Sequence, residues 1–450
     1  MKDVIVIGGG LAGTEAALQV AKRGIKVKLY EMKPVKFSDA HTNEDLAEVV
    51  CSNSFKSNLL TNACGLLKEE LRILGSELIP VADNTSVPAG QALAVDRELF
   101  SREVTKLVES NENIEVIREE VKEIPKDSIV IIATGPLTSE ILSEKIKELT
   151  GSDKLFFYDA AAPIIDKESI DMSIAFYGDR YSQERGKEEP EEEWRDRIKD
   201  DEGSYINLPM NKEEYEQFWS ELVNAEVVEL HEFEKREIFE GCMPLEIMAK
   251  RGLDTLRFGP LKPVGFTDLR TARRPYAVVQ LRQDNSEGNL YNIVGFQTNL
   301  KFGEQKRVFS MIPGLENANF VKYGVMHRNT YINSTMVLDN TYNMKENENI
   351  YFAGQITGVE GYVESIASGF IAGINAANKI LGREKFVMPK ETVNGALADY
   401  ISTENDKFQP MNANFGILPK LEENIRDKKV KYQKMADRSL DILKIIKENV

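Results

Sequence analysis

The sequence predicts an α/β fold: a Rossmann-like nucleotide-binding domain interrupted by a smaller α+β insertion. A glycine-rich turn between a strand and a helix opens the chain, and a second glycine-rich strand-to-helix segment lies near residue 354. Strands and helices alternate irregularly between them. We therefore expect the first part of this domain at 1–155, the insertion at 156–321, and the second part with a helical tail at 322–450.

The N-terminal segment has the order of a dinucleotide-binding unit. Val4–Ile7 is a β-branched strand, Thr14 to Arg23 is helix-compatible, and a second strand from Lys26 to Tyr30 ends at Glu31. A glycine-rich turn joins the first strand to the helix, and its residues are the first candidates for cofactor contact: Gly8, Gly9, Gly10, Leu11, Ala12 and Gly13.

Each residue type in this turn has a physical reason. Gly8 permits the tight turn, Gly10 lets the backbone approach a pyrophosphate, and Gly13 lets the helix pack closely on the strand. The helix N-terminus offers N–H groups and partial positive charge to the phosphates. Glu31, eighteen residues after Gly13, can take the ribose hydroxyls. The alternative is a glycine turn in an ordinary strand–helix–strand unit, but the full pattern predicts a bound dinucleotide.

Composition excludes several classes of protein. The 450 residues suffice for two or three domains, and no apolar run approaches the eighteen residues that span a bilayer. Three cysteines cannot form a disulfide framework, which favours a reducing cytoplasm, and with three histidines we expect no metal site. The net charge of −16 argues against unspecific nucleic-acid binding but allows a local basic face.

Two later strand ends extend the predicted cofactor site. The apolar strand from 128 to 133 ends in a turn typical of flavoproteins, and strand 351–353 leads through a glycine turn into a small-residue helix at 365–377. Paired with the first turn, this segment favours FAD over NAD. In the helix, Gly369 and Gly373 would allow close approach to a neighbour or a ligand. The added candidates are Ala133, Thr134, Gly135, Gly354, Gln355, Gly361, Glu364 and Ser365.

Two of the three cysteines lie in unusual settings. Cys242 is flanked by Gly241 and Pro244, which indicates a shaped turn, and Cys51 lies in a polar stretch with Ser52 and Asn53. Cys64 fits an apolar helix and is predicted to be a packing residue. A reactive thiol needs nearby cations or a helix N-terminus, which the sequence alone does not show.

These features together resemble one family. The chain is similar to the folate-dependent, FAD-containing tRNA uracil-5-methyltransferases, which are related to the small form of the GidA-type flavoproteins. The matching strings follow one order through nearly the whole chain: 8–13 with 31–34, 50–54, 87–90, 94–97, 133–138, 158–163, 239–246, 274–282, 323–328, 352–365 and 409–416. The resemblance implies a glutathione-reductase-type FAD-binding domain with an inserted domain.

The resemblance also implies a reaction. Family members methylate C5 of a T-loop uridine, position 54 of tRNA, taking the carbon from methylenetetrahydrofolate and reducing equivalents from NADH or NADPH. Carried over, Cys242 would be the nucleophile that adds to uracil C6 and Cys51 the acid–base partner, although these roles can be exchanged. The target base would have to be flipped out of the tRNA elbow. No obligate protein partner and no membrane are expected.

A basic group near Cys242 supplies candidates for RNA contact, which a net acidic protein must segregate. They are Arg270, Arg273, Arg274, Arg282 and Arg328. The acidic segment 179–202 replaces a compact turn of the family, and we expect a solvated loop or exposed helix there. Other possibilities are a ribosomal RNA uridine as target, a GidA-like wobble-uridine enzyme, or a plain flavin reductase, for which the chain lacks a CxxC pair and a second fingerprint.

Overall fold

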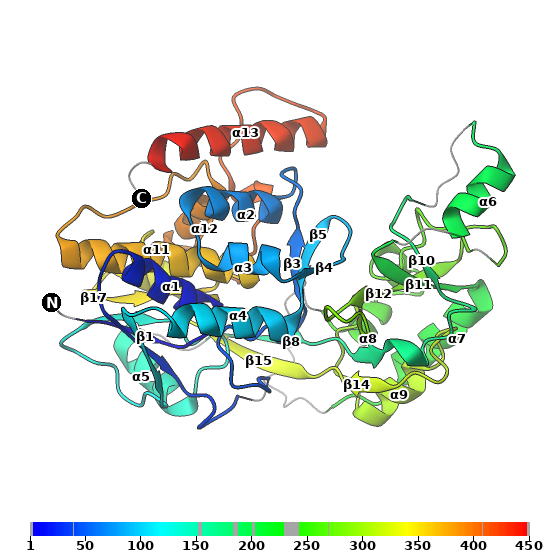
Figure 1. Cartoon of the computed structure of the whole chain (residues 1–450), viewed down its shortest axis with the longest axis horizontal. Coiled ribbons are helices and arrows are strands. Elements are labelled where there is room, and N and C mark those ends of the chain that lie inside the picture. The colour runs from blue at the N-terminus through cyan, green and yellow to red at the C-terminus, as the bar shows by residue number, and fades with distance from the viewer. Residues whose placement is uncertain are drawn as a thin grey trace.

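Two bodies of unequal size make up the chain (Figure 1). The computed structural model describes residues 3–38, 40–151, 155–182, 188–199, 203–228, 243–268, 270–406 and 408–447. In the described residues, no helix combines the length and apolarity needed to cross a membrane.

The larger body is built on a six-stranded sheet whose strands come from both ends of the chain. The order is β16 (Asn343–Met344), β17 (Asn347–Phe352), β7 (Ile129–Ile132), β1 (Val4–Ile7), β2 (Val27–Glu31) and β6 (Ile114–Arg118). The five strands from β17 to β6 are parallel to their neighbours, and β7, β1 and β2 are the inner strands of this parallel set. The continuous apolar run of β7 is fully buried, as expected for a parallel strand covered on both faces. The predicted α/β class is thus confirmed.

Helices α1 (Leu11–Lys22) and α11 (Tyr362–Leu381) pack on this sheet and on each other. A Cβ atom at Gly369 would lie 2.1 Å from the carbonyl oxygen of Ala12, and one at Gly373 would lie 2.7 Å from that of Ala16. The close approach predicted from the small residues is confirmed, and α1 is the neighbour. Outside them lie further helices: α2 (Ala63–Leu74), α3 (Leu78–Asn84), α4 (Arg97–Glu109), α12 (Val393–Ser402) and α13 (Lys428–Ile446).

The smaller body has its own six-stranded sheet and core. Its strands, in order, are β10 (Phe176–Tyr177), β11 (Tyr205–Met210), β12 (Ala277–Gln283), β13 (Leu290–Ile293), β9 (Ile164–Asp166) and β14 (Phe320–Lys322), all antiparallel. Its helices are α6 (Glu191–Lys199), α7 (Lys212–Asn224), α8 (Leu245–Ala249) and α9 (Phe302–Phe309). The domain limits at 155 and 321 stay predictions. In the acidic segment, α6 exposes Glu191–Glu193 and buries Trp194 and Ile198.

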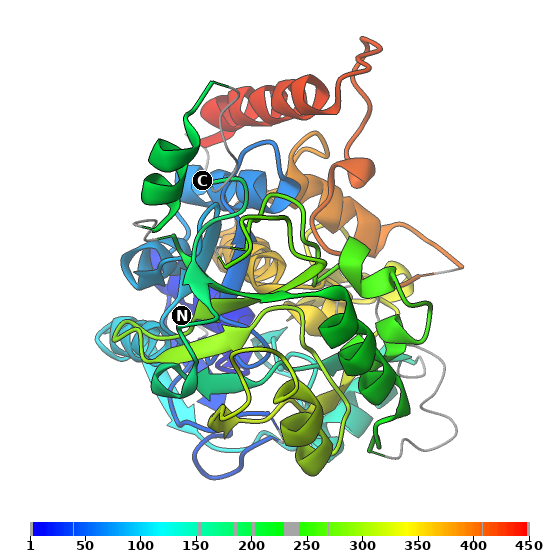
Figure 2. The ribbon, with the colours of Figure 1, turned by 90° about the vertical axis from the view of Figure 1, so that its right-hand side faces the viewer.

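Two strands carry the chain between the bodies. β8 (Leu155–Ala160) runs toward the smaller body and pairs antiparallel with β15 (Met326–Tyr331), which returns (Figure 1). A three-stranded sheet of β3 (Ser54–Ser57), β5 (Ala92–Val95) and β4 (Ser86–Val87) lies on the side of the larger body that faces the smaller one. Figure 2 views the molecule from the side of the smaller body, with α13 along the top. The remaining helices are α5 (Glu140–Thr150) and α10 (Ser334–Val337).

Candidate cofactor pocket and active site

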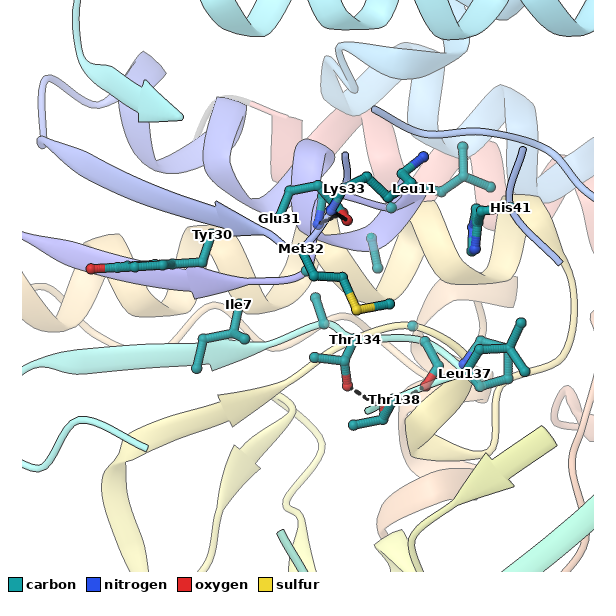
Figure 3. A pocket seen from close by; sticks show the side chains of 18 of the residues that line it. Ile7, Leu11, Tyr30, Glu31, Met32, Lys33, His41, Thr134, Leu137 and Thr138 are labelled. Atoms are coloured by element: carbon teal, nitrogen blue, oxygen red, sulfur yellow. Dashed lines mark hydrogen bonds between the residues drawn. The ribbon is translucent and has the colours of Figure 1, made fainter. Parts of the chain in front are cut away.

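An open pocket lies at the carboxyl ends of β1, β2 and β7, where open α/β sheets bind their ligands. Its space, mouth included, is about 1130 Å³. Figure 3 shows Glu31, Met32 and His41 on one side and Thr134, Leu137 and Thr138 on the other. Most of the predicted cofactor residues line it: Gly8, Gly9, Gly10, Leu11, Ala12, Glu31, Ala133, Thr134, Gly135, Gly354, Gln355 and Ser365.

The glycine turn has the geometry that its residue types predict. Gly8 has φ +106°, and a Cβ atom there would lie 2.4 Å from the carbonyl oxygen of Ala133. At Gly13 a Cβ atom would lie 1.8 Å from the carbonyl oxygen of Gly8, so only glycine permits this packing. A Cβ atom at Gly10 would meet nothing within 4 Å and would occupy space beside the pocket wall.

The Glu31 carboxylate is fixed at the pocket wall. Oε2 accepts a hydrogen bond from the backbone N–H of Gly9 at 2.9 Å, and Oε1 accepts one from that of Lys33 at 2.9 Å. Each oxygen retains acceptor capacity, since a carboxylate can take about four hydrogen bonds. Because the residue is 8 % exposed and lines the pocket, this remaining capacity suits ribose hydroxyls.

These residues fit a dinucleotide such as FAD. Helix α1 begins at the pocket, its N-cap Gly10 makes no side-chain cap, and the first-turn N–H groups of a helix lack partners within it. They can therefore donate to a pyrophosphate. Opposite, Thr134 Oγ1 and Thr138 Oγ1 lie 2.6 Å apart across the turn after β7.

In the described part of the chain, three of the predicted cofactor residues are not among those that line the pocket. Gly13 supports the turn from behind. Gly361, with φ +123°, is the N-cap of α11, and Glu364 is buried in the first turn of that helix. Glu364 Oε1 accepts from Lys56 Nζ at 3.2 Å and from the Ala413 N–H at 2.9 Å. Glu364 therefore links the first turn of α11 to Lys56 and Ala413.

The fingerprint alone misses several wall residues. Lys33 is buried, and its Nζ donates to the carbonyl oxygen of Asp45 at 2.6 Å and to Glu48 at 3.3 Å. Burial, with the positive charge of Lys33, lowers the pKa of His41, which also lines the pocket. Lys33 could have been found from the sequence, because it belongs to the segment 31–34 that resembles the family. Nothing in local spacing indicates His41, because an irregular segment brings it there.

Cys51 lies beside the pocket. Its neighbour Val50 lines the wall, as does Tyr362, the first residue of α11, whose hydroxyl oxygen is 3.0 Å from Cys51 Sγ. That oxygen accepts hydrogen bonds from the N–H groups of Cys51 at 3.1 Å and Ser52 at 3.2 Å. With its acceptor sites used in this way, the hydroxyl is set to donate its proton to sulfur, an arrangement that favours a thiolate.

Partly buried cationic groups lie near this cysteine. Burial opposes the charge of Arg97, but Asp284, together with Tyr362 and Cys51, raises its pKa overall. Its guanidinium therefore stays charged near Cys51. Burial, with the charge of Arg97, lowers the pKa of the half-buried Lys322 in the same neighbourhood. Burial raises the pKa of Tyr362 well above its usual range, so its phenol stays protonated.

The other two cysteines differ from Cys51 in what the structure describes of them. Cys242 lies outside the described residues. Cys64 is buried in α2, and burial raises the pKa of its thiol to about 11. A thiol with this pKa is unreactive near neutral pH, as expected of a packing residue.

The arginines predicted to contact RNA have divergent positions. Arg273 and Arg274 are exposed, and Arg270 is exposed but paired with Asp268 at 3.0 Å. Arg328 belongs to β15. Arg282 differs: it is 7 % exposed and donates a hydrogen bond to Ser52 in the segment 49–53, the Cys51 loop. This internal position is unlike that of a phosphate-contacting side chain.

The chain is similar to known proteins over nearly its whole length. The family "Glucose inhibited division protein A" matches residues 3–384. The chain is 61 % identical over 440 residues to the methylenetetrahydrofolate–tRNA-(uracil-5-)-methyltransferase TrmFO of Acetivibrio thermocellus, covering 98 % of this chain and 97 % of that protein. It is 58 % identical over 443 residues to the protein of the same name from Fusobacterium nucleatum, covering 98 % of each.

The fold is also similar to a solved structure. A crystal structure of Aquifex aeolicus GidA superposes with a TM-score of 0.69 at 18 % identity, covering 99 % of this chain and 73 % of that one. Sheet, fingerprint and pocket thus define a Rossmann-like FAD-binding fold of the GidA type. The chain belongs to the Glucose inhibited division protein A family and, with the relatives above, to its methylenetetrahydrofolate–tRNA-(uracil-5-)-methyltransferases.

Proposed function

We propose that the chain methylates C5 of a uridine in the T-loop of tRNA, position 54, with FAD as cofactor, methylenetetrahydrofolate as carbon donor and NADH or NADPH as reductant. One observation carries the proposal: Cys51, with Tyr362 and Arg97 around it, lies beside a dinucleotide pocket in a member of this family. The names of the relatives specify tRNA, which disfavours a ribosomal RNA target.

The chemistry needs two functional groups of the chain. Uracil C5 is a weak nucleophile, and a thiolate that adds to C6 makes C5 enolate-like. After C5 has taken the carbon, a base removes the C5 proton and the thiolate leaves C6. We assign addition to Cys242 and proton removal to Cys51, with exchange of the two roles as the alternative. Bound FAD would supply the redox chemistry of one-carbon transfer.

The surroundings of Cys51 support its assignment as a base. The Tyr362 hydroxyl donates toward Sγ, and Arg97 places positive charge nearby, so a thiolate that can accept a proton is favoured. We propose that Gly8–Ala12 and Glu31 hold the dinucleotide at the carboxyl ends of β1 and β2. Gly354, Gln355 and Ser365 would lie along the cofactor near the start of α11.

Recognition of tRNA would use exposed basic groups. Arg273 and Arg274 are exposed on the smaller body, and we keep them with Arg270 and Arg328 as candidates for phosphate contact. The T-loop uridine would be flipped toward the pocket. The cysteine content supports a cytoplasmic site for the reaction.

A labelling experiment tests this function. FAD-loaded protein is incubated with NADH, carbon-labelled methylenetetrahydrofolate and an unmodified tRNA transcript, and the nucleosides are then separated. We expect label in 5-methyluridine at position 54 and none in a transcript with cytidine there. Label in ribosomal RNA alone, or NADH oxidation that ignores the folate, would replace the proposal with one of the alternatives.

A further inference from the structure

A buried guanidinium holds the backbone just before Cys51. Arg97, the first residue of α4, donates from Nη1 to the carbonyl oxygens of Val49 and Val50, each at 3.0 Å. Its Nε donates to both carboxylate oxygens of Asp284, at 3.0 and 2.9 Å. The Arg97 side chain is 13 % exposed and that of Asp284 4 %. Arg97 is thus a fixed support for the approach to Cys51.

A second buried guanidinium holds the backbone just after Cys51. Arg282 donates from Nε to Asn53 Oδ1 at 2.9 Å and from Nη2 to Ser52 Oγ at 2.8 Å. Asn53 is fully buried, and its Nδ2 donates to the carbonyl oxygen of Gln283 at 2.9 Å. The polar side chains of Ser52 and Asn53 therefore have hydrogen-bond partners, as buried polar groups generally do.

The two supports come from different bodies. Arg97 belongs to the larger body, whereas Arg282 lies in β12 and Asp284 directly after it, in the smaller body. The same junction continues at Asp96 Oδ2, which accepts from the N–H of Ser286 at 2.8 Å and from its hydroxyl at 2.7 Å. The end of β12 is thus docked against both the Cys51 loop and the start of α4.

We propose that Arg97, Arg282 and Asp284 are positioning residues that hold Cys51 at the pocket and make its placement depend on the docked smaller body. The inference rests on the proposed function, because it assumes that Cys51 acts in the reaction. Arginine suits this role because its planar fork makes two directed bonds at once, which a lysine ammonium on a flexible stem does not reproduce. Small displacements of a reacting group are costly to the rate.

The first test separates positioning from RNA contact at Arg282. The variant Arg282→Lys keeps the positive charge and loses the fork. We expect kcat for tRNA methylation to fall by about a hundredfold, with KM for tRNA and FAD content unchanged. The control is Arg72→Lys, since Arg72 makes a similar two-bond pair with Asp83, at 2.8 and 2.7 Å, between α2 and α3. A raised KM with unchanged kcat in Arg282→Lys, or no change in either, overturns the proposal.

The second test needs neither RNA nor folate. Alkylation of Cys51 by iodoacetamide is followed across pH by peptide mass spectrometry in wild type, Arg97→Gln and Arg97→Lys, each checked for FAD content. We expect Arg97→Gln to react about tenfold more slowly near neutral pH, with its pH profile displaced upward because the positive charge is lost. Arg97→Lys keeps the charge but not the fork, so we expect the wild-type midpoint with an altered plateau rate. Identical profiles in all three proteins would show that Arg97 does not hold Cys51 in place. If the pH profiles of alkylation differ but the protein does not methylate tRNA, the proposed function is contradicted, whereas the role of Arg97 in holding Cys51 is retained.

Discussion

At the scale of single residues, the glycines of the first turn have separate roles. Gly13 is required by the protein itself, because its missing Cβ makes room for the carbonyl oxygen of Gly8. Gly10 has open space where its Cβ would lie, beside the pocket wall. Gly13 therefore serves packing, and we propose that Gly10 serves the ligand.

The variant Gly10→Ala tests this division. We expect it to fold with unchanged thermal stability and to lose FAD affinity, because the added methyl group occupies space that the pyrophosphate needs. Gly13→Ala should lose stability as well as FAD. The control is Gly303→Ala in α9, where a Cβ atom meets nothing within 4 Å. FAD titration by fluorescence and thermal unfolding check these outcomes, and equal FAD affinity in Gly10→Ala and wild type would contradict the division.

The cysteines give a second prediction at this scale. Cys242→Ala and Cys51→Ala should each abolish methylation and leave FAD bound, because in the proposed reaction one thiol adds to C6 and the other removes the C5 proton. Cys64→Ala is the control: its buried thiol, with a pKa of about 11, is outside the chemistry, and only a small loss of stability is expected. Turnover assays and absorbance of bound FAD measure both effects. Full activity of either of the first two variants would remove that cysteine from the mechanism.

Residues whose positions follow from local pattern were predictable, and those placed by tertiary structure were not. The turn from Gly8 to Gly13 and its acid Glu31 follow from spacing within one strand–helix–strand unit. Arg282 was predicted to contact RNA because basic residues cluster near it in sequence, but sequence distance does not report burial. Its side chain points into the Cys51 loop. Tyr362 was missed as a partner of Cys51, because a separation of 311 residues leaves no local signal.

At the scale of elements, a buried carboxylate ties three helices together. Glu70 of α2 accepts hydrogen bonds from the N–H groups of Val393 and Asn394, at the start of α12, at 2.8 and 2.9 Å. It also accepts one from Ser439 of α13 at 2.6 Å. Burial raises the pKa of Glu70 to about 7. In the folded protein this group therefore keeps its proton at pH values where the unfolded chain has lost it.

The sign of the resulting pH dependence is fixed. The pKa of Glu70 is higher in the folded protein than its unfolded value of 4.5. Its protonation therefore contributes to the free energy of unfolding fully below pH 4.5, and this contribution is lost as pH rises through about 7. It amounts to about 3 kcal/mol across that range. In Glu70→Gln, which cannot titrate, this part of the slope should be absent. Urea unfolding of both proteins between about pH 5 and 8 measures it, and parallel curves would contradict the assignment.

Elements with strong periodicity or apolar runs were predictable. The predicted strand at 128–133 contains β7, and the predicted helix at 365–377 lies within α11. The acidic segment was less predictable. Its charge indicates exposure, but α6 also buries Trp194 and Ile198, because two large apolar groups within a charged helix are enough to dock it.

At the scale of the whole molecule, the chain leaves one sheet, builds a second and returns. β17 then pairs with β7 in the first sheet, so that α11, which follows β17, packs on α1 at the pocket. The combination of both chain ends in one sheet could be foreseen from two glycine-rich strand-to-helix segments. The docking of β12 against the Cys51 loop could not, since it depends on how the two bodies meet.

The central claim is that FAD in this pocket takes part in delivering carbon to uridine beside Cys51. A single-turnover experiment tests it most directly: protein loaded with a measured amount of FAD, reduced, and mixed with labelled methylenetetrahydrofolate and excess tRNA transcript. We predict labelled 5-methyluridine in an amount equal to the bound FAD, and almost none with FAD-depleted protein or Gly10→Ala. Equal label in FAD-loaded and FAD-free protein would contradict the account.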